Sequence, residues 1–169
     1  GGSIRKVMEQ KDRLPGICGV VADLIHTEKR YETAIETALG GSIQNVVTED
    51  EETAKGLIAY LKQNRFGRVT FLPLTAVKNP QLFQREQVLK EPGVIGLAHT
   101  LVETHERYRN IMSQLLGRTV VVDQIDHAIG LQRKYHYSLR IVTLEGESMN
   151  PGGSMTGGAF RNSSSLLSR

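Results

Sequence analysis

Short apolar runs alternate with helix-like segments along most of the chain, and this alternation is the feature that most restricts the fold. Runs with the length and composition of strands cover residues 17–25, 43–47, 69–72, 120–122 and 139–144, and Met149 extends the last of them. Segments with apolar residues at helical spacing cover residues 28–39, 54–61, 108–115 and 126–135. This order predicts an α/β domain with mixed, partly parallel sheets and flanking helices.

Glycine and proline divide the chain. Residues 78–100 contain Pro80, Pro92, Gly93 and Gly96, which is typical of a loop. This break in the alternation of strands and helices predicts two lobes, which we place at residues 14–117 and 118–160. Thr48 and Glu51 have the spacing of a capping box at the start of the second predicted helix.

Both ends have helical features. A short stretch of coiled-coil spacing covers residues 4–13 and is followed by Pro15-Gly16, which ends helices. The composition of residues 163–169 predicts a serine cap and the first turn of another helix. Residues 1–3 (Gly-Gly-Ser) are typical of a cloning remnant, so we expect the chain to be part of a longer protein. Frayed termini are the alternative.

The composition limits the class of protein. The 169 residues include 39% hydrophobic and 23% charged residues, which excludes a fully disordered chain. The net charge of +3 permits contact with nucleic acid but does not require it. Cys18 is the single cysteine, which excludes an internal disulfide and is typical of a reducing compartment. No apolar run approaches the ~20 residues of a membrane span, so no membrane contact is expected.

Two catalytic motifs are incomplete. The glycine-rich segment 151–158 begins like a phosphate-binding loop, but Gly158 replaces the required lysine and Ala159 replaces the hydroxyl residue that would bind magnesium. His105-Glu106 begins like a zinc-protease motif, but Arg109 stands where the second histidine is needed. We therefore predict no catalytic site, no metal site and no cofactor in this chain.

The segment 152–158 contains four glycines in seven residues, and ordering glycine costs more backbone entropy than ordering any other residue. One interpretation is a flexible surface loop. The other is that a second backbone passes too close for a Cβ atom, for example the edge strand of another protein. The physical argument alone leaves both open.

Three motifs resemble the hinge domain of bacterial SMC (structural maintenance of chromosomes, condensin-type) proteins. They are ESMNPGGSMTGG at residues 147–158, the stretch from LPG at 14–16 through YETAIE at 31–36 to LGG at 39–41, and RFGRVTFLPL at 65–74. The resemblance covers roughly residues 14–160. It implies a two-lobed hinge with coiled-coil stubs at 4–13 and 161–169.

The resemblance also implies a role. Two hinges associate into a homodimer that joins long coiled-coil arms and organises DNA in chromosome condensation and segregation. The paired glycines at the dimer contact would be Gly152, Gly153, Gly157 and Gly158. ATP and magnesium would bind only at distant head domains, accessory subunits would bind elsewhere on the full protein, and the location would be the bacterial cytoplasm, at the nucleoid.

DNA is the second implied partner, bound weakly with a preference for single strands. The family often uses lysines just after the glycines, but this chain has only Arg161 there. The other candidates precede the first strand: Arg5, Lys6, Lys11 and Arg13. Ordinary solvated positions are the alternative for these side chains. For the whole chain, the alternatives are a monomeric nucleic-acid-binding domain and a small nucleotide-handling α/β enzyme.

Overall fold

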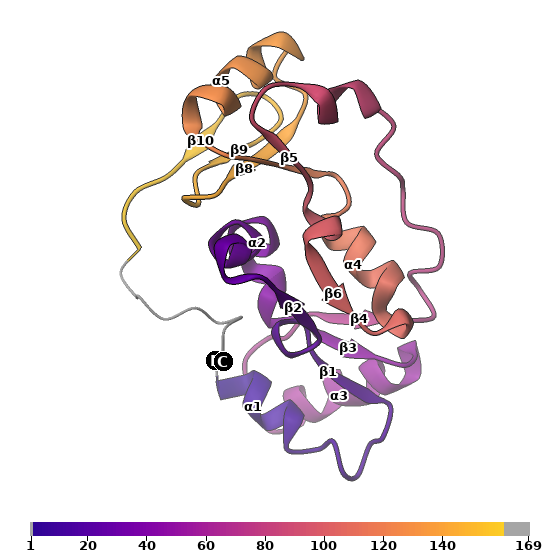
Figure 1. The fold of residues 1–169 in the computed structure, drawn as a ribbon. Helices are drawn as coiled ribbons and strands as arrows, with labels where there is room; N and C mark the ends of the chain where they lie inside the picture. Colours follow the sequence, from indigo (N-terminus) through magenta and orange to yellow (C-terminus); the bar gives the residue numbers. More distant parts are fainter. Residues whose placement is uncertain (1, 161–169) are drawn as a thin grey trace.

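The computed structural model describes residues 2–160, in which helices pack between and outside three separate sheets (Figure 1). The strands are β1 Ile17–Val20, β2 Ile25–Thr27, β3 Val46–Thr48, β4 Phe71–Pro73, β5 Val94–Leu97, β6 Val102–Thr104, β7 Thr119–Val122, β8 Arg140–Thr143, β9 Ser148–Met149 and β10 Met155–Thr156. The α-helices are α1 Gly2–Met8, α2 Glu32–Leu39, α3 Glu51–Gln63, α4 Arg109–Leu116 and α5 Ile125–Lys134. Short 3-10 helices cover Val21–Asp23, Lys29–Tyr31, Gly40–Gln44, Glu86–Lys90, Ala98–Leu101 and Glu106–Tyr108.

The largest sheet has five strands in the order β10-β9-β8-β7-β5. Strands β7 and β8 are parallel, and the other neighbouring pairs are antiparallel. A second sheet has the order β1-β3-β4 with β3 and β4 parallel, and β2 and β6 form an antiparallel pair. These mixed sheets with flanking helices confirm the α/β prediction.

The five-stranded sheet is covered on both faces. Val120 and Ile141 pack on one side with Leu131 of α5. Val121 and Val142 pack on the other side in the cluster that includes α2 and α4. A strand buried on both faces needs an unbroken apolar run, which is why the three valines at 120–122 were a reliable indication of β7.

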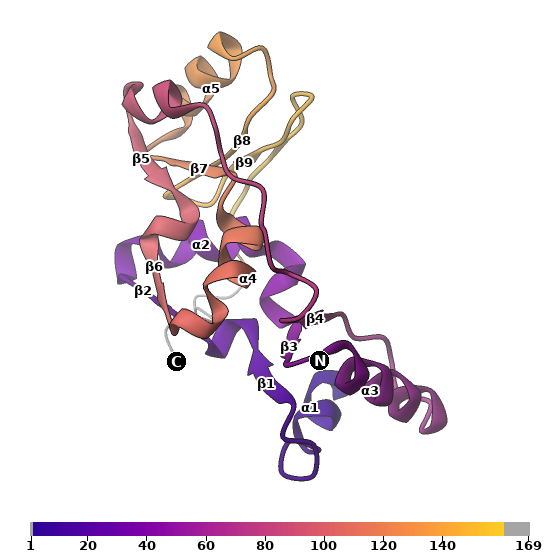
Figure 2. The same cartoon turned by 90° about the vertical axis from the view of Figure 1, so that its right-hand side faces the viewer.

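A third cluster packs α1 against α3 and the second sheet through Val7, Leu57 and Val46. It lies at the end of the molecule opposite to α5 and the β9–β10 hairpin, as both views show (Figures 1 and 2). The helix of the predicted N-terminal stub ends at Met8, and residues 9–13 continue as turns. Residues 161–169 of the other predicted stub lie outside the described residues.

The loop prediction for residues 78–100 is wrong at its C-terminal end, where β5 pairs with β7. The strand was not predicted because Gly93 and Gly96 are typical of loops. The register shifts between Val94 and Gly96, and a Cβ on Gly93 would lie 2.4 Å from Nδ1 of His127. The five-stranded sheet thus includes a strand from before residue 118, and the lobe division at 117/118 stays a proposal.

The start of α3 also differs from the prediction. Asp50, rather than Thr48, caps the helix, because its carboxylate accepts a hydrogen bond of 2.8 Å from the backbone N–H of Thr53. This bond, and a second from the Thr53 hydroxyl, lower the pKa of the Asp50 carboxyl below its ordinary value. Thr48 instead donates its hydroxyl proton to the carbonyl of Asp50.

Candidate self-association and nucleic-acid interface

The first glycine pair lies in the turn that joins β9 to β10. Asn150, Pro151, Gly152 and Gly153 form a type II turn, closed by a 2.9 Å hydrogen bond from the Gly153 N–H to the Asn150 carbonyl. The third position of this turn needs a positive φ, and Gly152 has a φ of +96°. Its N–H also donates to the carbonyl of Tyr137 at 2.8 Å. The turn therefore accounts for Gly152 within a single chain.

The second glycine pair follows β10, which forms one edge of the five-stranded sheet. Within residues 2–160, no strand pairs with the outer side of β10. A Cβ on Gly157 would meet only the side chain of Glu147, at 3.1 Å, and a Cβ on Gly158 would have nothing within 4 Å. No backbone of the described chain therefore comes close enough to exclude a side chain here.

Gly157 and Gly158 also differ in conformation. Gly158 has a φ of +135°, which side-chain-bearing residues rarely adopt, whereas the φ of Gly157 is outside that region. Neither its backbone angle nor a neighbouring backbone explains why position 157 is glycine. Gly157 is thus the residue at which the close-approach interpretation is most directly testable.

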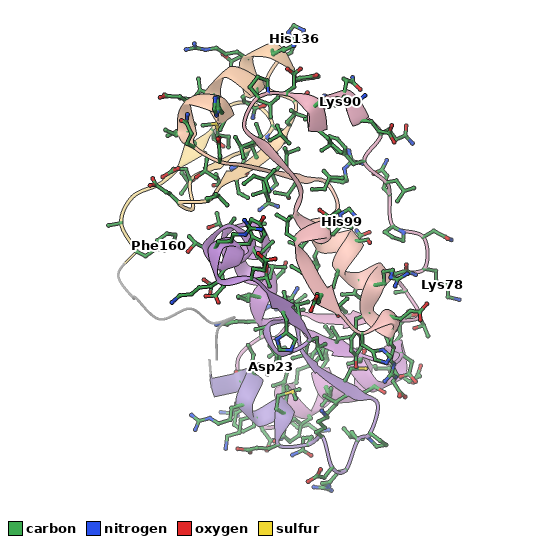
Figure 3. All side chains as sticks on the ribbon, in the orientation of Figure 1. Asp23, Lys78, Lys90, His99, His136 and Phe160 are labelled. Atoms are coloured by element: carbon green, nitrogen blue, oxygen red, sulfur yellow. The ribbon has the colours of Figure 1, made fainter. Side chains whose placement is uncertain are left out.

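Two large apolar side chains flank this pair. Met155 on β10 is 53% exposed, and Phe160 is 61% exposed. Phe160 lies beside α2 (Figure 3), with its ring next to Gly146 and Thr33. Neither residue was expected at a contact from the sequence pattern, although an apolar side chain within a Gly, Ser and Thr segment is a usable indication. Exposed apolar groups beside an unpaired strand edge are typical of a surface that contacts another protein.

The basic candidates lie at the other end of the molecule, on and after α1. All four are exposed, and two have contacts within the chain. Lys6 lies 3.8 Å from Glu9, and Lys11 donates to the carbonyl of Cys18 at 3.3 Å. Arg5 and Arg13 form no ion pair within residues 2–160. Arg161, the fifth candidate, lies outside the described residues.

Burial shifts the pKa values of Cys18 and His99. Burial raises the pKa of the Cys18 thiol above its ordinary value, and the nearby Arg107 offsets only part of this effect. Burial likewise lowers the pKa of His99. In residues 2–160, no group of three or more His, Cys, Asp or Glu side chains is arranged to hold a metal ion. None of the helices there is both long and apolar enough to cross a membrane.

Comparison with known proteins identifies the family. The family model described as "SMC proteins Flexible Hinge Domain" matches residues 14–132. This chain belongs to the SMC hinge family. The hinge is 47% identical over 169 residues to the "Chromosome partition protein Smc" of Bacillus subtilis, with 98% of this chain and 14% of that protein covered. The chain thus spans about a seventh of the length of that relative.

Solved structures support the same assignment for the hinge. The "asymmetric dimer of the Geobacillus stearothermophilus SMC hinge domain" matches with a TM-score of 0.90 at 41% identity, covering 98% of this chain and 67% of that one. The Pyrococcus furiosus SMC hinge domain matches with a TM-score of 0.77 at 37% identity, covering 95% of this chain and 82% of that one.

Proposed function

We propose that this hinge domain joins two copies of its chain, using the outer edge of β10 and the Gly157-Gly158 pair that follows it. The supporting observation is the combination of an unpaired strand edge with two glycines that have no backbone neighbour in their own chain. Met155 and Phe160 supply apolar surface for the contact. The similar Geobacillus domain is described as a dimer, which agrees with this proposal.

In this proposal, Gly157 and Gly158 act by letting two backbones approach. A methyl group in a closely packed contact typically costs ~1–3 kcal/mol, and in a two-fold dimer each substitution acts twice. Replacing Gly152, Gly153, Gly157 and Gly158 together with Ala is therefore expected to weaken or abolish dimerisation. Because none of the four lies in a helix, the helix content of the monomer should not change.

Circular dichroism and light-scattering mass test this variant together. A monomeric mass with an unchanged helical spectrum supports the proposal. Dimerisation that persists at nanomolar concentration contradicts the close-approach argument, because the methyl groups added at Gly157 and Gly158 would then fit into the contact.

DNA binding is the second proposed property, carried by the exposed cations Arg5, Lys6, Lys11 and Arg13 together with Arg161. Such binding rests on phosphate contacts, so it should be independent of sequence and should fall steeply between about 50 and about 200 mM salt. Fluorescence anisotropy with labelled single-stranded and duplex DNA measures this. An affinity that does not change with salt contradicts the basic-patch proposal.

A charge-matched pair of variants localises the effect. Arg5→Gln with Arg13→Gln should weaken DNA binding and reduce its salt dependence. Lys90→Gln with Arg133→Gln removes the same charge near α5, at the far end of the molecule, and should leave binding unchanged (Figure 3). Equal losses in the two variants would assign the binding to overall charge rather than to the N-terminal segment.

In the whole protein, the proposed role is to link two coiled-coil arms for chromosome condensation and segregation in the bacterial cytoplasm, at the nucleoid. The name "Chromosome partition protein Smc" of the Bacillus relative supports this role. The ATPase reaction belongs to distant heads in this proposal, and accessory subunits bind outside the hinge.

A further inference from the structure

A pocket of about 500 Å³ lies between the end of α4, the first residues of β7 and β8, and the segment at residues 81–85. Figure 2 shows the chain between β4 and β5 running past α4 on its way to this position. Three arginines line the pocket: Arg85, Arg118 and Arg140. The lining contains no Asp or Glu side chain.

The sheet brings these arginines together. β7 and β8 are parallel neighbours, with Thr119 opposite Arg140. Arg118 directly precedes β7, and Arg140 is the first residue of β8, so both arginines lie at the N-terminal end of this parallel pair. Arg85 approaches from the segment at residues 81–85, and its Nη1 donates a hydrogen bond to Oγ of Ser138.

The positive charge in this pocket is not compensated. Within residues 2–160, none of the three arginines forms an ion pair, whereas Arg107 lies 2.7 Å from a carboxylate oxygen of Glu49. Nη2 of Arg140 donates to the carbonyl of Ala38 at 3.0 Å, but its Nε is buried without a partner. Arginine stays protonated at any physiological pH, so the pocket gathers three permanent cations.

We propose that this pocket binds the phosphate groups of a phosphorylated ligand of nucleotide size. The planar guanidinium group matches two phosphate oxygens at once, and the volume is within the usual range for small-ligand sites. Gln81, Gln84 and Gln114 also line the pocket, and their amides both donate and accept hydrogen bonds, as a base or a sugar requires. Pro151 of the β9–β10 turn also lines the pocket, but no residue of β10 and neither Gly157 nor Gly158 does, so the site does not include the edge proposed for self-association.

Isothermal titration calorimetry of the intact chain tests the proposal by measuring the dissociation constants of four probes. They are pyrophosphate, thymidine 5′-monophosphate, unphosphorylated thymidine and a short oligothymidylate. The phosphorylated probes should bind, and thymidine should not. Arg118→Gln should weaken their binding by about tenfold or more, because it removes a charge-assisted hydrogen-bond donor. Arg118 is exposed, so this variant should stay folded. The exposed Arg133→Gln, with the same change of charge, should leave binding unaltered.

The probes also identify the source of the phosphate. Equal affinity for the mononucleotide and the oligomer indicates a free nucleotide, and much tighter binding of the oligomer indicates a DNA strand. The proposal is overturned if no phosphorylated probe binds at millimolar concentration, or if Arg118→Gln and Arg133→Gln weaken binding equally. It is also overturned if Arg118→Gln lowers the solution mass while phosphate binding is unchanged, because the arginines would then hold the second copy.

Discussion

Gly152 and Gly153 lie within the turn of the β9–β10 hairpin, whereas Gly157 and Gly158 follow its outer strand. The turn itself needs the first pair, since Gly152 and Gly153 have φ values of +96° and +105°, which side-chain-bearing residues rarely adopt. The second pair has no comparable backbone contact in the described chain, and Gly157 lacks even the conformational reason. In the proposed dimer, one glycine-rich motif therefore serves two requirements, one within the monomer and one in the contact with a second copy.

The largest expected effect comes from Gly157→Ala combined with Gly158→Ala. Two sites at ~1 kcal/mol or more, each present in both copies, cost about 4 kcal/mol or more together and should weaken dimerisation by at least roughly several hundredfold. Analytical ultracentrifugation over a concentration series measures the dissociation constant, and circular dichroism checks that the monomer is folded. Unchanged dimerisation in the folded double variant would remove the distinction between the two pairs.

Two helical glycines provide the matched control. Gly56 in α3 and Gly130 in α5 have nothing within 4 Å of an added Cβ. Replacing both with Ala makes the same chemical change and should leave dimerisation as it is. The free energy of unfolding of this variant should rise by roughly 0.5–1 kcal/mol per site, because alanine is more favourable than glycine within a helix.

A smaller effect on dimerisation is expected from Met155→Ser. Loss of this half-exposed apolar side chain from the contact should cost about 1 kcal/mol, which is roughly a fivefold weaker dimer. Ile58→Ser is the control, since Ile58 is similarly exposed (45%) but lies on α3 at the other end of the molecule. If the two variants weaken the dimer equally, the contact does not lie at β10.

The smallest expected effect is that of Gly152→Ala, and it concerns stability rather than association. Placing a side chain at a positive φ should destabilise the turn by about 1 kcal/mol, which lowers Tm by roughly 2–4 °C for a domain of this size. Gly152→Asn should lose less, because asparagine tolerates this turn position. Calorimetry at one fixed protein concentration compares the Tm values of the two variants. A large loss of dimerisation in Gly152→Ala would contradict the assignment of Gly152 to the turn alone.

The sequence predicted the parts of the fold in which one strong local pattern acts. The unbroken valines of β7 and the helical spacing of α5 both correspond to elements of the structure. β5 was missed because Gly93 and Gly96, which there allow close packing and a register shift, are also typical of loops. Its strand character depends on pairing with β7, which no local pattern reveals.

The candidate sites were predictable to different degrees. The glycines were found as one motif, and the Pro151-Gly152 dipeptide already contained the information for the turn. The distinction between this turn and the pair Gly157-Gly158 could not be predicted, because it depends on the strand order, in which β10 is an edge strand. The pocket arginines were not predictable, because Arg85, Arg118 and Arg140 are far apart in sequence and only the parallel pairing of β7 and β8 brings two of them together.

The most direct test of self-association is light-scattering mass on a size-exclusion column, with the unaltered chain measured across about a hundredfold dilution. A dimer held together at β10 predicts twice the chain mass of 18.7 kDa, maintained to low concentration. A mass of one chain at every concentration would contradict the proposal that this hinge joins two copies of itself.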